Sequence, residues 1–249
     1  MNHQPAPAET AARIAHRNLL TTLEEKVHPP HTALIVVDMQ NDFCSPGGMM
    51  DNEGLDLSAV QAMAARLPAL IESARRAGTL VVFVRNVYST NDNLYLSDAW
   101  LEQALRRRGE SYTNRMVCAE GSWEGDFYGE VHPLPGEPVV TKHRFSAFYN
   151  TDLDTILRAH GIRTLVMTGV ATNVCVETTA REGFVRDYYI VFLSDGTACY
   201  SEDDQAATLR VIDGLFGQVS SVAEVAGIWD GRGAAATAAQ AATSASTLG

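Results

Sequence analysis

A cysteine that follows an apolar run and a small-residue turn is the strongest chemical signal in the chain. Cys175 lies within residues 168–177 (TGVATNVCVE), where we expect a strand to end and a helix to begin. A helix N-terminus offers unpaired N–H groups and the positive end of a dipole, and both favour a thiolate. Because the thiolate is the nucleophilic form, this segment predicts nucleophilic chemistry. The alternative interpretation is a buried cysteine that packs as a small apolar side chain.

Two charged residues also follow apolar runs. Asp38 stands after LIVV, and Lys142 follows VVT. Taken alone, Asp38 is also consistent with a turn cap and Lys142 with a surface lysine at a sheet edge. Together with Cys175 they form a possible catalytic set, in which Asp38 accepts the thiol proton and Lys142 holds the charges in place. Cys175 would then attack a carbonyl carbon and form an acyl-enzyme, with backbone N–H groups of residues 169–175 as the oxyanion hole.

Such a set requires a scaffold that brings the ends of three strands together. Short apolar runs alternate with helical patterns, which is typical of a parallel sheet covered on both faces. We therefore predict an α/β fold: a three-layer αβα, Rossmann-like, doubly wound domain with a mainly parallel sheet of about six strands. Ligands bind beyond the carboxyl ends of such strands. The expected strands are residues 33–37, 79–85, 138–141, 164–168, 189–193 and, more weakly, 218–222; the expected helices are 57–77, 96–108, 151–160, 173–186 and 202–215.

Composition divides the chain into three parts. Residues 1–30 are predicted to be an N-terminal extension with a helix over 8–23, and residues 31–230 a single α/β domain. Residues 231–249, rich in Ala, Thr and Ser, are predicted to be a disordered tail. The segment 87–123 is long and irregular, so it could cover a pocket or face a partner. Its basic run, residues 106–108, is interpreted as the solvated end of a helix.

Charge and cysteine usage exclude several classes of function. The net charge of −11 argues against binding to nucleic acid or to an anionic membrane. We find no apolar run of membrane-spanning length and no signal-peptide pattern, so a cytoplasmic location is expected. The four cysteines contain no CxxC pair and no zinc-ligand spacing. GxGxxG, P-loop and GxSxG motifs are also missing from the sequence, and we expect no cofactor.

Three segments together resemble the isochorismatase-like cysteine hydrolases: residues 34–40 (LIVVDMQ), 141–148 (TKHRFSAF) and 168–177. The resemblance extends from about residue 32 to residue 225. It implies that Asp38 is the base, Lys142 the electrostatic partner and Cys175 the nucleophile. It also implies a cis peptide bond between Val170 and Ala171, oxyanion donors at the N–H groups of Ala171 and Cys175, and a homo-oligomer, either a dimer or a tetramer.

Within this family, residues 84–90 (VRNVYST) lack the histidine of the nicotinamidase metal site, so we expect no catalytic metal. Residues 46–48, 121–123, 144–151 and 181–184 are similar to the ureidoacrylate amidohydrolases of pyrimidine degradation. The resemblance implies a metal-independent cysteine amidohydrolase that cleaves a C–N bond of a small ureido or carbamoyl compound and releases carbamate and ammonia. Alternatives are a biuret, triuret or N-carbamoyl amino-acid amidohydrolase, an isochorismatase-type hydrolase, or a non-catalytic binding protein on the same fold.

Further residues near the set are candidates for contact with the substrate. Polar side chains could hydrogen-bond an amide or instead cap turns, and arginines could bind a carboxylate or instead form surface ion pairs. Aromatic side chains could form the walls of the pocket or instead pack in the core. The predicted substrate-binding residues are Gln40, Asn41, Phe43, Arg85, Asn86, Trp123, Arg144, Phe148 and Tyr149.

Overall fold

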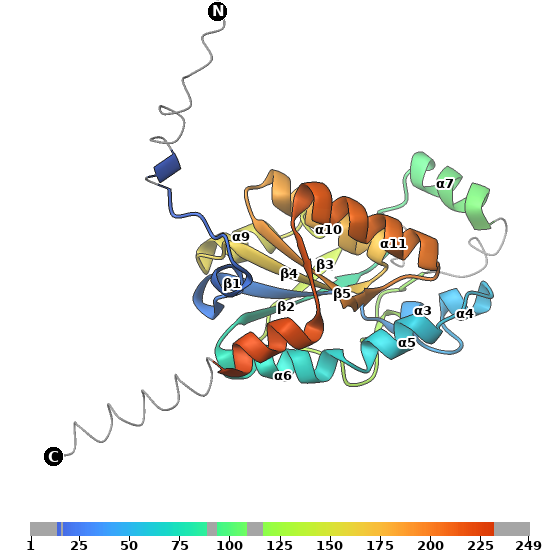
Figure 1. Cartoon of the computed structure of the whole chain (residues 1–249). Helices are drawn as coiled ribbons and strands as arrows, with labels where there is room; N and C mark the ends of the chain where they lie inside the picture. The colour runs from blue at the N-terminus through green and yellow to red at the C-terminus, as the bar shows by residue number, and fades with distance from the viewer. Residues whose placement is uncertain (1–13, 16, 89–93, 109–116, 232–249) are drawn as a thin grey trace, which may run out of the picture.

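A single six-stranded sheet forms the centre of the protein, whose computed structural model describes residues 14–15, 17–88, 94–108 and 117–231. All paired strands are parallel, in the order β3-β2-β1-β4-β5-β6 (Figure 1). This topology confirms the predicted doubly wound α/β fold. The strands are β1 (Thr32–Val37), β2 (Leu80–Asn86), β3 (Val139–Lys142), β4 (Thr164–Val170), β5 (Tyr189–Ala198) and β6 (Gln218–Ser220).

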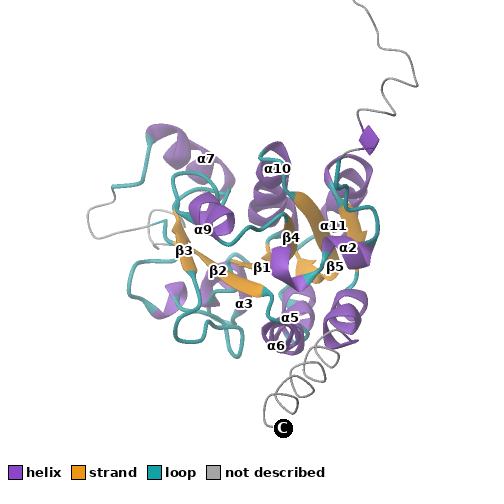
Figure 2. Ribbon diagram, turned by 90° about the vertical axis from the view of Figure 1, so that its left-hand side faces the viewer, coloured by secondary structure: helices purple, strands orange, loops and turns teal. Residues whose placement is uncertain are grey.

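Two helical layers cover the sheet, because the strands bury side chains on both faces. In β1, Leu34 and Val36 face one apolar cluster, whereas Ile35 and Val37 face the other. The first cluster includes side chains of α5 (Ser58–Ala64), α6 (Leu67–Ala77) and a helix of residues 222–231. The second includes side chains of α9 (Leu153–Ala159) and α10 (Glu177–Val185), with α11 (Glu202–Val211) on the same side. Figure 2 shows the helices on the two sides of the sheet.

The predicted helix over residues 57–77 is wrong in one respect, because it is two helices. Pro68 lies in the first turn of α6. A proline ring inside a continuous helix would clash with the carbonyl four residues earlier, here that of Ala64. Accordingly α5 ends at Ala64, and α6 begins afresh at Leu67.

The predicted N-terminal helix is also wrong over residues 17–22, which are not helical. The helix here is α2 (Leu23–Lys26), which begins at a reciprocal capping box between Thr22 and Glu25. Of the remaining residues of that prediction, most lie outside the described part of the chain.

The structure contains several short helices that the hydrophobic periodicity of the sequence did not predict. Two four-residue helices, α3 (Asn41–Cys44) and α4 (Met49–Asn52), follow β1 directly. The helix of residues 222–231 carries Trp229, which is fully buried and donates from Nε1 to the Val27 carbonyl at 2.9 Å. The predicted tail from residue 232 onward lies outside the described residues, and the predicted domain boundaries stay predictions.

In the described part of the chain, we find no helix with both the length and the apolar character needed to cross a bilayer.

Candidate active site

The side chains of Asp38, Lys142 and Cys175 meet at the carboxyl edge of the sheet. Lys142 Nζ lies 2.8 Å from Asp38 Oδ2 and 3.3 Å from Cys175 Sγ. Its third contact is a hydrogen bond of 3.1 Å donated to the Arg144 carbonyl. An ammonium has three N–H donors, so this lysine has one acceptor for each of them. Exposed fractions of 1%, 0% and 6% for the three residues show that the cluster is almost completely buried.

The strand order explains why a lysine is needed at this position. Lys142 ends β3, which is separated from β1 by β2, whereas Asp38 comes directly after β1. Because neighbouring strands lie about 4.8 Å apart, the charge must cross roughly 10 Å of sheet. The long stem of Lys142 covers much of that distance. Tyr88 lies beside this stem, with its ring centroid 5.9 Å from Nζ.

Burial dominates the electrostatics of the ion pair. It raises the pKa of Asp38 above its usual range, although the positive charge of Lys142 acts in the opposite direction. Burial alone would lower the pKa of Lys142, but the charges of Asp38 and Cys175 outweigh it, and that pKa is raised. The lysine is therefore held as a cation next to a carboxyl group whose proton affinity is above normal, which suits an acceptor of a thiol proton.

The expectation that the helix start makes Cys175 favour the thiolate is wrong, because burial has the larger effect on its pKa. Burial raises the pKa of Cys175 to about 12; the positive charge of Lys142 acts in the opposite direction, and the Asp38 carboxylate adds to the increase. Cys175 lies in a π-helical turn, Thr172–Val176, that leads into α10, so the predicted helix start is present. The field of a helix end stabilises a charge by about 1 kcal/mol, which is less than the cost of burying a thiolate.

The turn before Cys175 brings its backbone close to β1. Gly169 has a φ of +104°, and a Cβ at this position would lie 2.0 Å from the Val37 carbonyl oxygen, so only glycine fits. The peptide bond between Val170 and Ala171 is cis, as the family resemblance implied. Ala171 and Cys175 both line the pocket beside Asp38. This placement is consistent with the oxyanion hole predicted at their N–H groups.

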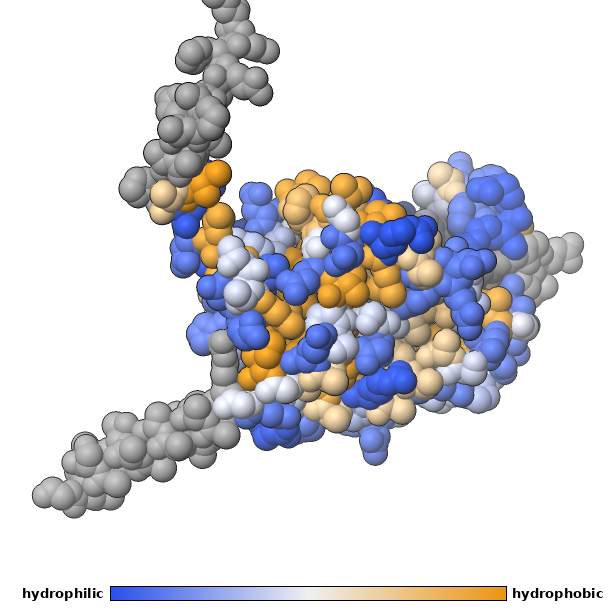
Figure 3. Space-filling model, viewed as in Figure 1, coloured by the Kyte–Doolittle hydropathy of each residue, from blue (hydrophilic) through white to orange (hydrophobic). Residues whose placement is uncertain are grey.

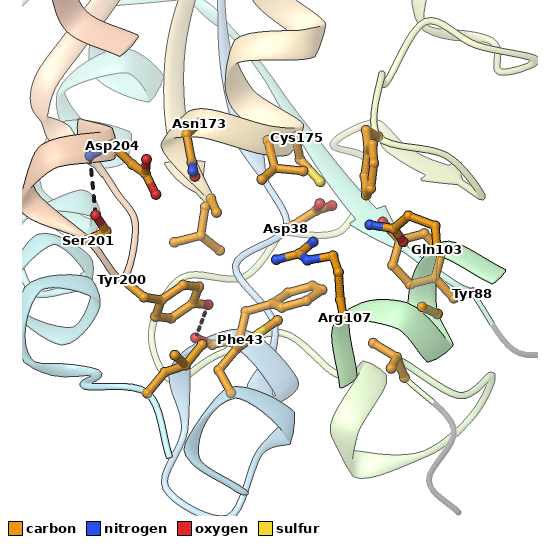
Figure 4. Close-up of a pocket in the computed structure, with 18 of the residues that line it drawn as sticks. Asp38, Phe43, Tyr88, Gln103, Arg107, Asn173, Cys175, Tyr200, Ser201 and Asp204 are labelled. Carbon is orange, nitrogen blue, oxygen red and sulfur yellow. Dashed lines mark hydrogen bonds between the residues drawn. The ribbon is translucent and has the colours of Figure 1, made fainter. Parts of the chain in front are cut away.

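A pocket of about 270 Å³ opens over Asp38 and Cys175 (Figure 4). Its walls come from the loop and helices after β1, Tyr88 just after β2, the helix α7 (Asp98–Arg108), the turn that contains Cys175 and the start of α11. The lining is largely apolar and aromatic, with polar side chains on α7 at one side and on the Cys175 turn and α11 at the other. Aromatic and polar lining residues include Phe43, Tyr88, Trp100, Gln103, Arg107, Phe145, Asn173, Tyr200 and Asp204.

Of the nine predicted substrate-binding residues, Phe43 lines this pocket. Gln40 instead connects two loops, since its side chain bonds the backbone of Asn86 at 2.7 and 2.9 Å and the Gly125 carbonyl at 2.8 Å. Asn41 donates to the Trp123 carbonyl at 2.8 Å. These contacts give the two amides structural roles at the edge of the sheet, and we do not propose them as substrate ligands.

The remaining predicted residues also lie outside the lining. Arg85 donates to Thr141 Oγ1 at 3.0 Å, and Arg144 donates to the Tyr95 carbonyl at 3.0 Å. Phe148 is buried in the core, whereas Tyr149 and Trp123 are exposed. The lining contains a different arginine, Arg107, which lies at the exposed C-terminal end of α7 as the sequence predicted and also borders the pocket. The missed signal is the spacing of Trp100, Gln103, Ala104 and Arg107, which puts all four on one face of α7.

The raised pKa of Asp38 predicts the acid side of the pH profile. Proton acceptance needs the ionised carboxylate, and a raised pKa means that the carboxylate takes up a proton at a higher pH than a free aspartate, whose pKa is about 3.9. We expect kcat/KM to fall on acidification with an apparent pKa clearly above that value. Initial rates from about pH 4 to about pH 9 measure it. An acid limb at or below the free-aspartate value would contradict this account.

The fold and the cluster define a three-layer α/β protein with a buried cysteine beside a charged pair at the carboxyl edge of its sheet. Residues 32–224 match the family model of the isochorismatase domain. The chain therefore belongs to the isochorismatase family.

Curated relatives and solved structures agree with this assignment. Ureidoacrylate amidohydrolase RutB from Enterobacter sp. (strain 638) is 41% identical over 206 residues, 79% of this chain and 88% of the relative. RutB from Stutzerimonas stutzeri (strain A1501) is 43% identical over 202 residues, 77% of this chain and 79% of the relative. A cysteine hydrolase from Pseudomonas syringae pv. phaseolicola 1448A has a TM-score of 0.71 at 28% identity, covering 87% of this chain and 99% of that one. N-carbamoylsarcosine amidase from Thermoplasma acidophilum has a TM-score of 0.60 at 27% identity, covering 77% and 96%.

Proposed function

We propose that this protein is a cysteine amidohydrolase that cleaves a C–N bond in a small ureido compound of the ureidoacrylate type. The observation that carries the proposal is the contact of one buried lysine with both Asp38 and Cys175 at the floor of a pocket. The relatives named as ureidoacrylate amidohydrolases support the same reaction and substrate class.

In the first half of the reaction, Asp38 accepts the proton of the Cys175 thiol as sulfur attacks the ureido carbonyl carbon. A C–S bond forms, and the carbonyl oxygen becomes an oxyanion that the N–H groups of Ala171 and Cys175 stabilise. Lys142 keeps its positive charge next to the developing thiolate, which offsets the unfavourable burial of that charge. Collapse then breaks the C–N bond, and the proton held by Asp38 moves to the leaving nitrogen.

The second half releases the carbamoyl group from sulfur. Water attacks the carbamoyl thioester while Asp38 accepts a proton from that water. The C–S bond breaks, the proton returns to Cys175, and carbamate leaves and decomposes to ammonia and carbon dioxide. The same carboxyl group therefore acts twice as base and twice as acid, which fits a buried group of raised proton affinity.

Ammonia release from a panel of substrates tests the proposal. We expect the wild-type enzyme to release ammonia from ureidoacrylate, with biuret and N-carbamoyl amino acids as the alternative substrates. Turnover of none of them would contradict the proposed substrate class and favour a binding protein on this fold. Hydrolysis of a vinyl ether such as isochorismate by a variant that lacks Cys175 would instead support a reaction without a covalent step.

A homo-oligomer in the cytoplasm remains part of the proposal. An exposed apolar patch supports self-association: Phe184 and Val185 at the end of α10 lie exposed, as does Leu215 in the turn after α11. Figure 3 shows apolar side chains gathered over this region of the molecule. Exposed apolar patches of this kind are typical of protein interfaces.

A further inference from the structure

The helix α7 presents one face to the pocket. Trp100, Gln103, Ala104 and Arg107 all line it, at the spacing i, i+3, i+4 and i+7 that places side chains along one stripe of a helix. In Figure 4 the Arg107 side chain extends from α7 toward the middle of the pocket. Of the basic run at the end of α7, Arg107 therefore lies on the helix face that is turned toward the pocket.

At the N-terminal end of this helix face, contacts of Trp100 hold α7 against the wall of the pocket. The Trp100 ring lies 5.0 Å from the Tyr88 ring and 4.8 Å from the Phe145 ring, and the Arg144 guanidinium lies 5.1 Å from its centroid. Ala104 is buried in the same face. Because Tyr88 also lies beside Lys142, the position of α7 is tied directly to the catalytic cluster.

The charge of Arg107 is not neutralised by another residue that the structure describes. Its neighbour Arg106 points away and pairs with Glu102 at 3.1 Å on the exposed side of the helix. Within the pocket, the carboxylate of Asp38 is already paired with Lys142. The other lining carboxylate, Asp204, belongs to α11 and makes no ion pair with Arg107 in the described structure. Among the residues that the structure describes, Arg107 therefore has no ion-pair partner, and it lines the same pocket as Cys175.

We propose that Arg107 binds the carboxylate of an anionic ureido substrate and so sets the substrate class of this enzyme. The inference rests on the proposed amidohydrolase function. A guanidinium presents two parallel N–H groups that match the two oxygens of a carboxylate. The carboxylate end of the substrate would lie at α7 while its ureido carbonyl lies at Cys175. Ureidoacrylate and N-carbamoyl amino acids meet this requirement, whereas the uncharged biuret and triuret do not.

The test compares ureidoacrylate with its carboxamide, which has nearly the same shape and no charge. The measured quantity is the ratio of kcat/KM for the acid to kcat/KM for the carboxamide, from ammonia release. We expect Arg107→Gln to lower this ratio by about 10- to 100-fold, the range of a lost charge-assisted hydrogen-bond pair. Arg107→Lys should retain part of the preference. Arg106→Gln, on the outer face of the same helix turn, should leave the ratio within about twofold of wild type.

The possible outcomes separate this inference from the proposed function. Equal use of the acid and the carboxamide by the wild-type enzyme, or an unchanged ratio in folded Arg107→Gln, would overturn the role of Arg107 and leave the amidohydrolase activity standing. Turnover of neither compound by the wild type would overturn the proposed function, and the inference with it. Far-UV circular dichroism and the melting temperature of each variant establish that it is folded. If Arg107→Gln does not fold, the ratio in Arg107→Lys decides.

Discussion

Replacement of Cys175 with alanine is expected to lower kcat/KM for the ureido substrate by on the order of 10⁴-fold or more, because no other group in the cluster can form the covalent intermediate. Among the described residues that line the pocket, Cys175 is the only thiol, and Lys142 already directs its three protons to fixed acceptors. Ammonia release under saturating and limiting substrate measures the loss. A folded variant with activity within tenfold of wild type would contradict the mechanism.

Two matched variants make this result specific. Cys199→Ala removes another buried thiol, whose sulfur bonds the Ser201 carbonyl at 3.2 Å, and should keep nearly full activity. Cys175→Ser retains a nucleophilic oxygen of much lower acidity, so its activity should lie far below wild type. A large loss in Cys199→Ala would indicate that disturbance of the fold, and not loss of the nucleophile, explains the effect of removing Cys175.

Replacement of Lys142 with methionine is expected to destabilise the fold by about 3–5 kcal/mol as well as to abolish activity. Methionine fills a similar volume, but it leaves the carboxylate of Asp38 buried without its ion-pair partner at 2.8 Å. Without Lys142, the pKa of Asp38 rises further. Stability linked to a raised pKa is present at low pH and is lost as pH rises. The deficit should therefore be small in acid and grow toward neutral pH, as measured by urea unfolding at several pH values.

A double-mutant cycle separates the effect of losing the Lys142 charge from the effect of changing the shape of its side chain. Asp38→Asn combined with Lys142→Met removes both charges, and the pair should be less destabilised than Lys142→Met alone. Arg106→Met breaks an exposed ion pair with Glu102 and should change the unfolding free energy very little. A Lys142→Met variant that is as stable as wild type at neutral pH would show that Asp38 is not ionised in the native protein.

The fold and the meeting of Asp38, Lys142 and Cys175 were predictable because both depend on local patterns. Apolar runs ending in Asp38 and Lys142 define strand ends, and a parallel sheet necessarily brings strand ends to one edge. The protonation state of Cys175 was not predictable in this way. A helix start near Cys175 favours the thiolate, but burial, which depends on tertiary packing, has the larger effect and raises the thiol pKa to about 12.

The wall of the pocket was predicted less well, for a related reason. Gln40 and Asn41 lie two and three residues after Asp38, yet their amides bond backbone groups of neighbouring loops. Proximity in sequence to a catalytic residue does not determine where a side chain points. Arg107, by contrast, lies 69 positions from Asp38 along the chain, and it reaches the pocket because Trp100 of α7 packs against Tyr88. The helical spacing places Arg107 on the same face of α7 as Trp100, but the local sequence does not indicate that this face is turned toward the pocket.

The central claim is that Cys175 carries the carbamoyl group during turnover. Rapid acid quenching of the enzyme during reaction with ureidoacrylate, followed by peptide mass spectrometry, tests it most directly. The account predicts one carbamoyl group on the peptide that contains Cys175, absent in Cys175→Ala and absent when substrate is omitted. Continued turnover in Cys175→Ala, together with no carbamoyl group on that peptide of the wild type at any reaction time, would contradict it.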